Sequence, residues 1–263
     1  MDRTDTAYLI NTTPKYFYLL PLHITLLHRY APILKWPIYL ATEAPELLPP
    51  LEHPNLVILK LPMTASGFLE SRAVATEMLP PTIKYVFPMQ EDFLLEGRPM
   101  EKEIAEAFSA LCTEGPVHSV RLMPCPGPKS KRVFNETKLQ ELDFQIEMVF
   151  TYQATIWERT AYQTFMTTLL HKLAGLSQKE KNRMAISVNI AEIQDGQRIL
   201  KQLNGVHLSV SREYAHPNAV YLCPWPYRPT AVVRGTLEPW AIELAEREGL
   251  PLISVIKRYE NST

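Results

Sequence analysis

Glycine is scarce in this sequence. The 263 residues include nine glycines and 23 prolines. Neither GxGxxG nor GxxxxGKS/T occurs, so the chain lacks the common glycine-rich loops that cradle phosphates through backbone N–H groups. Because proline fixes the backbone angle φ, we expect proline to stiffen many of the loops instead.

The chain also has few cysteines, almost no net charge and no long apolar run. Its three cysteines are widely spaced and form no CxxC or Cys/His cluster, which argues against a disulfide framework and against a zinc site. A net charge of -1 gives no overall field that would recruit nucleic acid or acidic lipid. No run reaches about 18 apolar residues, and the first residues lack a basic-then-apolar signal pattern. We therefore expect no transmembrane span and a cytoplasmic location.

Strands and helices alternate in the first half of the sequence. This alternation indicates an α/β fold, a Rossmann-like, mostly parallel central sheet flanked by helices. One predicted helix, 15–30, has apolar residues at three- and four-residue steps, and Pro21 either kinks it or marks a late start. Strands are predicted at 7–11, 36–41, 56–61, 84–89 and 117–122, and helices at 15–30, 68–79 and 101–112.

The second half is less regular. No clean linker separates it from the first half, so we expect one continuous domain over residues 1–263 with an irregular C-terminal half. One or two strands are predicted around 151–153, helices at 160–174, 190–203 and 239–248, a charged turn at 179–183, and strands or extended segments at 219–223 and 252–256.

Two adjacent acids follow the most apolar predicted strand. Residues 83–95 read IKYVFPMQEDFLL, in which Glu91 and Asp92 come directly after a run typical of a buried parallel strand. Ligands of open α/β sheets bind beyond the carboxyl ends of the strands. A carboxylate pair at that place can hold a hard divalent cation, and the cation can hold a diphosphate. The alternative is that both acids simply open an exposed turn.

Three short segments follow one another in the order found in a known family. Residues 90–93 read QEDF, residues 152–157 read YQATIW and residues 230–235 read TAVVRG. In that order they resemble the acidic motif, the Q-x-x-I-W segment and the V-x-x-G segment of GT-A-fold glycosyltransferases, specifically a small, divergent type found in bacteria and large DNA viruses. In that type the acidic motif stands in place of the DxD signature of the wider fold. The resemblance covers most of the chain and implies a GT-A-like fold.

The resemblance also implies an activity. It implies transfer of a hexosyl or pentosyl group from a UDP- or GDP-sugar to a glycan or glycolipid, with residues 1–125 binding the nucleotide-sugar donor and residues 126–263 the acceptor. It implies Mn²⁺ or Mg²⁺, because a metal that bridges both phosphates stabilises the departing diphosphate. Asp92 matches the last acid of the motif and is the first expected metal ligand. Glu91 is the second, or contacts the ribose instead. Because the motif departs from a strict DxD, weak metal binding or none is the alternative.

Polar residues at the other predicted strand ends are candidates for donor binding. Asn11, Thr12 and Thr13 end the first strand and are expected to contact the base and ribose. Alternatively, one of the threonines caps the helix that starts near Pro14. Glu43 follows the second strand, where it lies either near the base or in an exposed loop.

Two arginines are candidates for the diphosphate. Arg72 lies in the helix before the acidic strand, where it either binds a phosphate bidentately or pairs with Glu70 or Glu77 on a solvated face. Arg234, in the third family-like segment, is expected to close on the diphosphate.

An inverting transfer needs a general base for the acceptor hydroxyl. The resemblance places such an acid early in a helix beyond the Q-x-x-I-W segment, which points to Glu192. Asp195 is the nearby substitute and Glu158 is a third choice, whereas stabilising the helix dipole is the alternative role of Glu192. Aromatic residues either fill the core or stack on a sugar, and Trp225, between two prolines, is the best candidate for stacking. The aromatic candidates are Tyr152, Trp157, Trp225, Tyr227 and Trp240.

Two other functions compete with a glycosyltransferase. A non-catalytic GT-A-like module that binds a nucleotide or a glycan fits the departures from the family motif. A nucleotidyltransferase shares the sheet and the metal but normally has a glycine-rich, basic loop after its first strand. Residues 11–15 read NTTPK and contain no glycine, so we rank this function lower.

Overall fold

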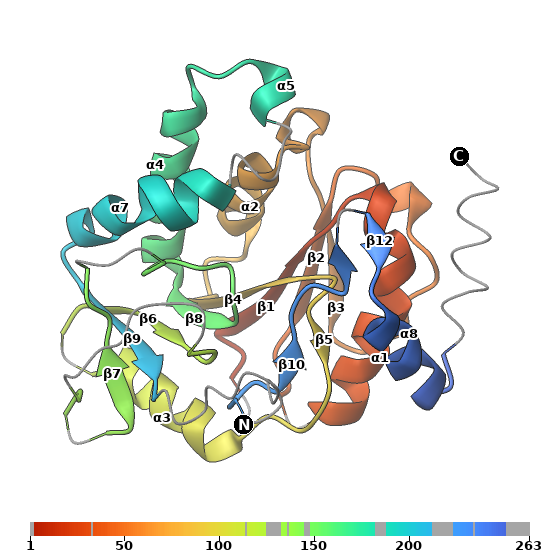
Figure 1. Ribbon diagram of the computed structural model, residues 1–263, viewed down its shortest axis with the longest axis horizontal. Coiled ribbons are helices and arrows are strands. Elements are labelled where there is room, and N and C mark those ends of the chain that lie inside the picture. The colour runs from red at the N-terminus through yellow and green to blue at the C-terminus, as the bar shows by residue number, and fades with distance from the viewer. Residues whose placement is uncertain are drawn as a thin grey trace.

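An eight-stranded sheet forms the centre of the molecule (Figure 1). The computed structural model describes residues 3–32, 34–113, 115–124, 133–135, 137–144, 148–181, 188–211, 223–233 and 235–250. The strands lie in the order β3-β2-β1-β4-β8-β6-β9-β7. Their bounds are β1 Thr6–Asn11, β2 Ile38–Thr42, β3 Leu56–Lys60, β4 Tyr85–Gln90, β6 Val117–Arg121, β7 Leu139–Glu141, β8 Thr155–Glu158 and β9 Val206–Val210.

The sheet is mostly parallel, as the sequence predicts. Strands β1 to β4 are parallel, and β6 is parallel to β9. Strand β8 runs antiparallel between β4 and β6, and β7 is antiparallel to β9 at one edge. Because β8 comes from the second half of the sequence, both halves contribute to one sheet. Two short antiparallel ribbons complete the strands: β5 (Leu94–Leu95) pairs with β10 (Tyr227–Arg228), and β11 (Val232–Val233) pairs with β12 (Thr236–Leu237).

Helices cover both faces of the sheet. Side chains of β1 alternate between two hydrophobic clusters: Tyr8 and Ile10 pack with α1 and α3, whereas Ala7 and Leu9 pack with α2 and α4. This two-residue period, with every residue of β1 buried, is typical of a central strand. The α-helices are α1 Leu20–Tyr30, α2 Phe68–Met78, α3 Glu101–Leu111, α4 Arg159–Leu173, α5 Gln178–Lys181, α7 Gly196–Gln202 and α8 Pro239–Arg247. Short 3-10 turns are η1 Pro14–Leu19, η2 Pro45–Leu47 and η3 Met63–Ala65, and η4 Ile190–Gln194 is a π-helical turn.

The structure corrects several predicted elements. The single helix predicted at 15–30 is a 3-10 turn followed by α1, and Pro21 lies in the first turn of α1. Proline is tolerated there because the first N–H groups of a helix have no partner inside it, so the late start is confirmed. The segment 151–153 is irregular and β8 begins only at Thr155. Strand β9 lies where the sequence predicts no strand. The extended segments predicted at 219–223 and 252–256 lie outside the described residues, except for Cys223.

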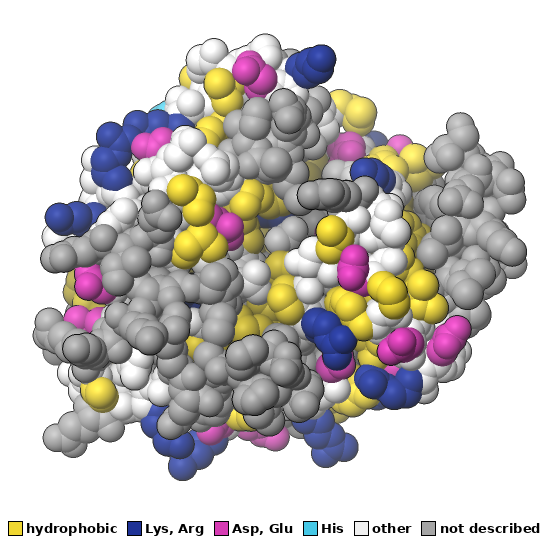
Figure 2. Space-filling model, in the orientation of Figure 1, with side chains coloured by type: hydrophobic (Ala, Val, Ile, Leu, Met, Phe, Trp, Pro, Cys, Tyr) yellow, Lys and Arg dark blue, Asp and Glu magenta, His cyan; other side chains and the backbone are white. Residues whose placement is uncertain are grey.

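The described helices, α4 included, are shorter than a helix that spans a membrane. Within the described ranges, no helix is long and apolar enough to cross a bilayer. On the face shown in Figure 2, hydrophobic side chains gather near the middle, and many charged side chains lie toward the outline.

Candidate functional site

The carboxyl ends of β1, β2 and β4 meet at one edge of the sheet. Asn11, the last residue of β1, is in register with Ala41 of β2 on one side and with Gln90 of β4 on the other. The residues that follow these strands are therefore brought together although they lie about 30 to 80 positions apart in the sequence. They are the polar residues that the sequence predicts for donor binding.

A cleft of about 600 Å³ opens at this edge. That volume lies in the range of about 300–1,000 Å³ typical of small-molecule sites. The structure thus brings together seven of the eight residues predicted to bind the donor. The cleft is lined by the predicted residues Asn11, Thr12, Thr13, Glu43, Arg72, Glu91 and Asp92, and also by Pro14, Lys15, Tyr16, Ser66, Phe68, Ser71, Gln90 and Val232.

Glu91 and Asp92 lie side by side and are largely withdrawn from water. Burial, and secondly the charge of Asp92, raise the pKa of Glu91 from 4.5 to about 8. Burial raises the pKa of Asp92 from 3.8 to about 6, although the backbone N–H of Val232 donates to its carboxylate. The charge of Arg72 partly opposes both shifts. The acids therefore do not form the exposed turn that was the alternative, since Glu91 is only 8% exposed.

A buried histidine holds the acidic turn in place through a hydrogen bond. His23 of α1 lies 3.0 Å from the Tyr8 hydroxyl through Nε2 and 3.1 Å from the Glu91 carbonyl oxygen through Nδ1. Because a carbonyl can only accept, Nδ1 carries the proton and the Tyr8 hydroxyl donates to Nε2. Burial lowers the pKa of His23 to about 4, so the ring is neutral. No metal-ligand spacing points to His23 in the sequence, and its role is structural.

Arg72 lies inside the cleft wall and not on a solvated face. Its side chain is 5% exposed, and its guanidinium lies 3.6 Å from the centre of the Phe68 ring. Nη1 donates to the Phe68 carbonyl oxygen at 2.8 Å. Among the described residues it forms no ion pair with Glu70 or Glu77. A buried cation that faces two carboxyl groups is available to an anionic ligand.

The polar residues after β1 have different partners. The Asn11 amide donates to the Ser71 carbonyl oxygen at 3.0 Å, which joins β1 to α2. The Thr12 hydroxyl lies beside the Glu91 carboxyl but forms no hydrogen bond of ordinary geometry with described residues. Thr13 occupies the N-cap position of η1 without a side-chain capping bond, so the capping alternative is not realised. Glu43 accepts a long bond of 3.4 Å from the Thr42 hydroxyl at the end of β2.

The β11–β12 ribbon borders the cleft. The Ala231 N–H donates to the Asp92 carbonyl oxygen at 3.0 Å, next to the bond from Val232 to the Asp92 carboxylate. Gly235, with φ of +83°, forms the turn of the ribbon, where L-residues with a side chain are strained. Arg234 lies outside the described residues, so its predicted contact with the diphosphate stays a prediction. Lys15, at the start of η1, is a further cation at the cleft, and no motif in the sequence points to it.

The candidate bases lie beyond the cleft lining. Glu192, in η4, accepts a hydrogen bond from the Tyr152 backbone N–H at 3.0 Å, and burial raises its pKa. Asp195 is engaged by Arg198 and by Lys172, whose Nζ lies 3.8 Å away. Glu158 caps α4, accepting from the N–H groups of residues 160 and 161 at 2.9 and 2.7 Å. Of the three acids, Glu192 keeps the environment most suited to a base.

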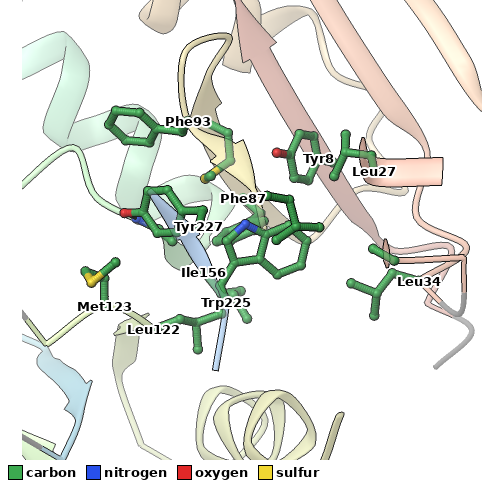
Figure 3. Packing of buried hydrophobic residues seen from close by; sticks show 14 of the residues in the cluster. Tyr8, Leu27, Leu34, Phe87, Phe93, Leu122, Met123, Ile156, Trp225 and Tyr227 are labelled. Atoms are coloured by element: carbon green, nitrogen blue, oxygen red, sulfur yellow. Dashed lines mark hydrogen bonds between the residues drawn. The ribbon is translucent and has the colours of Figure 1, made fainter. Parts of the chain in front are cut away.

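Trp225 belongs to the core and not to a sugar-binding wall. It is 1% exposed and packs against Phe87, Trp36 and Tyr8, with a ring-centre distance of 4.8 Å to Phe87. Figure 3 shows it in the middle of the cluster. The flanking prolines predict an exposed loop. However, β10 follows immediately and pairs with β5, and this pairing places Trp225 in the hydrophobic core. Trp157 and Tyr227 are buried as well, which agrees with the default role of large aromatics.

The acids fit a hard divalent cation. Two adjacent carboxyl groups supply oxygen ligands, and the unpartnered Thr12 hydroxyl lies beside them. Burial raises the pKa values of both acids, and the charge of Arg72 only partly opposes these shifts. Within the described residues, no group of three or more His, Cys, Asp or Glu side chains is arranged to hold a metal. A cation would therefore need further ligands from water or from a phosphate.

Comparison with solved structures identifies the architecture. The glycosyltransferase GlyE of Streptococcus pneumoniae TIGR4 superimposes with TM-scores of 0.52 (apo form) and 0.51, at 10% and 12% identity, over 99% of this chain. The fold is GT-A-like. This chain covers 64% of the GlyE chain in both structures. The 4-diphosphocytidyl-2C-methyl-D-erythritol synthase of Anaerococcus prevotii DSM 20548 matches with a TM-score of 0.43 and 10% identity, over 78% of this chain and 88% of that one, which supports no conclusion. No model of a protein family and no curated protein sequence matches the chain.

Proposed function

We propose that this protein is a glycosyltransferase that moves a hexosyl or pentosyl group from a UDP- or GDP-sugar to a glycan or glycolipid acceptor. One observation carries the proposal: the cleft at the carboxyl ends of β1, β2 and β4 gathers two buried acids, a buried arginine and the polar residues after β1. This is the place where open α/β sheets bind nucleotides. The GT-A-like fold supports it. We also propose that the protein is cytoplasmic.

The charges at the cleft favour a metal-dependent donor. Its described lining carries two cations, Lys15 and Arg72, and three carboxyl groups, those of Glu43, Glu91 and Asp92. Because the pKa of Glu91 is about 8, two carboxylates are ionised near neutral pH and they cancel the two cations. The lining then offers a diphosphate no net positive charge, which a divalent cation would supply. We propose that Asp92 and Glu91 hold Mn²⁺ or Mg²⁺, which when bound stabilises the diphosphate leaving group.

The remaining side chains bind and orient the donor. Arg72 is fixed by Phe68 and offers its remaining N–H groups to a phosphate. Asn11, Thr12, Thr13 and Glu43 are proposed to contact the base and ribose, since they end β1 and β2 beside the acids.

Nucleotide binding tests this proposal directly. We would measure, by calorimetry, the affinity for UDP, GDP and their sugars with and without Mn²⁺. Asp92→Asn keeps the size of the side chain and removes the charge, so we expect it to weaken the metal-dependent affinity at least about 10-fold, since a charge-assisted contact contributes about 1.5–3 kcal/mol. Glu46→Gln, at an exposed position on η2, is the control and should bind as wild type does. Wild-type protein that binds none of these nucleotides would contradict the proposal.

We further propose an inverting reaction with Glu192 as general base. Burial raises its pKa, which is the direction that favours a general base, although Glu192 does not line the cleft. Glu192→Gln should therefore lower kcat of sugar transfer at least about 100-fold, the typical effect of a general base, and leave donor affinity within about twofold. Asp195→Asn serves as the comparison. Equal losses in kcat and donor affinity would mean that Glu192 supports the fold and not the chemistry.

A non-catalytic nucleotide- or glycan-binding module is the second candidate. Two observations favour it: the described residues contain no group of three or more His, Cys, Asp or Glu side chains placed to hold a metal, and none of the three candidate bases lines the cleft. Metal-dependent hydrolysis of a nucleotide sugar by the purified protein would exclude this module.

A further inference from the structure

A second, much smaller cavity lies beside the cleft. Arg72 and Gln90 line both cavities, and Tyr152 and Tyr162 line only the small one. Its volume is about 10 Å³. Roughly 10–15 Å³ of such space is what one water molecule needs, so the cavity has room for a water and for nothing larger.

Two polar atoms at this cavity lack partners. The hydroxyl groups of Tyr152 and Tyr162 are buried and form no hydrogen bond with any described residue. Tyr162 as a whole is 1% exposed. Buried hydroxyl groups are nearly always bonded, either to protein or to an ordered water. Two unpartnered phenols at one small cavity therefore indicate a shared partner.

Arg72 supplies the third polar group. Its guanidinium carries five N–H donors, and the described structure assigns one of them to the Phe68 carbonyl oxygen. It also lies over the Tyr152 ring, 5.5 Å from its centre. The charge of Arg72 favours the ionised form of both phenols, lowering their pKa values against the much larger effect of burial. All three groups thus lie within short electrostatic range of one another.

We propose that the small cavity holds one ordered water that accepts a hydrogen bond from the Arg72 guanidinium and exchanges hydrogen bonds with the hydroxyls of Tyr152 and Tyr162. A water with three polar partners is typical of buried sites. It would join α2, which carries Arg72, to α4 and to the segment before β8, and so fix the guanidinium from behind.

This water gives Tyr162 a role at the proposed donor site, a consequence that rests on the proposed function. Tyr162 does not line the cleft. It acts as a positioning residue, because the water it holds leaves the other N–H groups of Arg72 directed at a phosphate. Removing its hydroxyl should let the guanidinium move and weaken phosphate binding without removing any group that touches the ligand.

A crystal structure of the full chain at high resolution tests the water itself. We expect a density peak in the small cavity within hydrogen-bond distance of Arg72 and both phenol oxygens, and its loss or displacement in Tyr162→Phe. An empty cavity, or a cavity closed by the Gln90 side chain, would overturn the proposal. This result does not depend on whether the protein binds nucleotides.

Calorimetry tests the consequence for binding. With Mn²⁺ present, we expect Tyr162→Phe to weaken binding of UDP and of inorganic pyrophosphate about fivefold to 10-fold and to leave binding of uridine unchanged. Phe165→Leu, on the same helix and in the same core but without a hydroxyl, is the matched control and should bind all three as wild type does.

The outcomes separate the two hypotheses. A wild type that binds neither UDP, GDP nor pyrophosphate contradicts the proposed function, while the crystal structure still decides the water. A bound water together with unchanged affinity in Tyr162→Phe overturns the positioning role alone. An equal loss in Tyr162→Phe and Phe165→Leu attributes the effect to packing and overturns that role as well.

Discussion

Glu91 and Asp92 are neighbours in the sequence, yet their surroundings differ. Glu91 is buried and its own carbonyl oxygen accepts from His23, whereas the carboxylate of Asp92 accepts from the backbone N–H of Val232. The pKa of Glu91 is therefore raised further, to about 8, than that of Asp92, to about 6. Without a cation, the two buried acids destabilise the folded state, and a bound cation would remove that destabilisation.

The raised pKa values predict how stability depends on pH. In the unfolded chain the two acids have their ordinary values of 4.5 and 3.8, below the values of the folded protein. At pH values between the pKa of the unfolded chain and that of the folded protein, the folded state binds more protons than the unfolded state. Raising the pH through this window therefore destabilises the folded state. We expect the melting temperature of the metal-free protein to fall by several degrees from pH 5 to pH 8, since about 1 kcal/mol shifts it by roughly 2–4 °C in a domain of this size.

Glu91→Gln provides the control for this pH dependence. It removes the group with the larger shift, so its melting temperature should fall less than that of wild type over the same range. Differential scanning calorimetry at several pH values, with a chelator present, measures both. Identical slopes for the two proteins would assign the pH dependence to other groups.

At the scale of elements, the ends of helices decide the roles of several polar residues. Glu158 follows β8 and begins α4, where its carboxylate accepts two backbone N–H groups. Thr13 stands at the corresponding place before η1 but makes no such bond. The difference follows from the type of helix: the tight 3-10 turn with Pro14 at its start has one N–H fewer to satisfy.

We expect Glu158→Ala to destabilise the protein by about 1 kcal/mol, the typical cost of losing an N-cap. Glu158→Asp, which keeps a capping carboxylate, should restore most of that stability. Chemical unfolding in urea measures both variants. If Glu158→Ala kept full stability but abolished sugar transfer, Glu158 would be the base and not a cap.

At the scale of the whole molecule, the cleft joins segments that are far apart in the chain. Residues 11–16, 43, 66, 68, 71, 72, 90–92 and 232 meet there because β1 lies between β2 and β4, and because the β11–β12 ribbon returns to the acidic turn. Strand β8 inserts antiparallel beside β4 and attaches the second half of the chain to the same sheet. Helices α2 and α4 pack against each other on one face of the sheet, so Arg72 and Tyr162 belong to the same layer.

This arrangement predicts a pattern of hydrogen exchange. Binding of a nucleoside diphosphate with Mn²⁺ should slow amide exchange at 11–16, 90–95 and 231–237 together, since a ligand that binds only the folded state suppresses local opening around its site. Peptides from α3, on the opposite face from α2, are the internal control and should be unchanged. Protection confined to one of the three segments would mean that the ligand binds elsewhere.

The sequence by itself determined the fold class and the position of the acidic turn. Apolar runs such as residues 84–89 have the period and the length of buried strands, and acids that follow such a strand lie at its carboxyl end whatever the sheet order. The strand ends at Asn11 and Glu43 could be found in the same way, because neighbouring residues alone determine the local pattern of apolar and turn-forming residues.

Only the tertiary structure decided which of these residues meet and which are buried. Arg72 shows no local sign of being buried, and its position follows from the packing of α2 on β1. Trp225 looks like a loop residue between two prolines, but the pairing of β10 with β5 carries it into the core. The unpaired hydroxyls beside Arg72 come from two separate segments, 152 and 162, whose side chains converge only when α4 packs against α2. Such contacts depend on distances across the chain that no local pattern encodes.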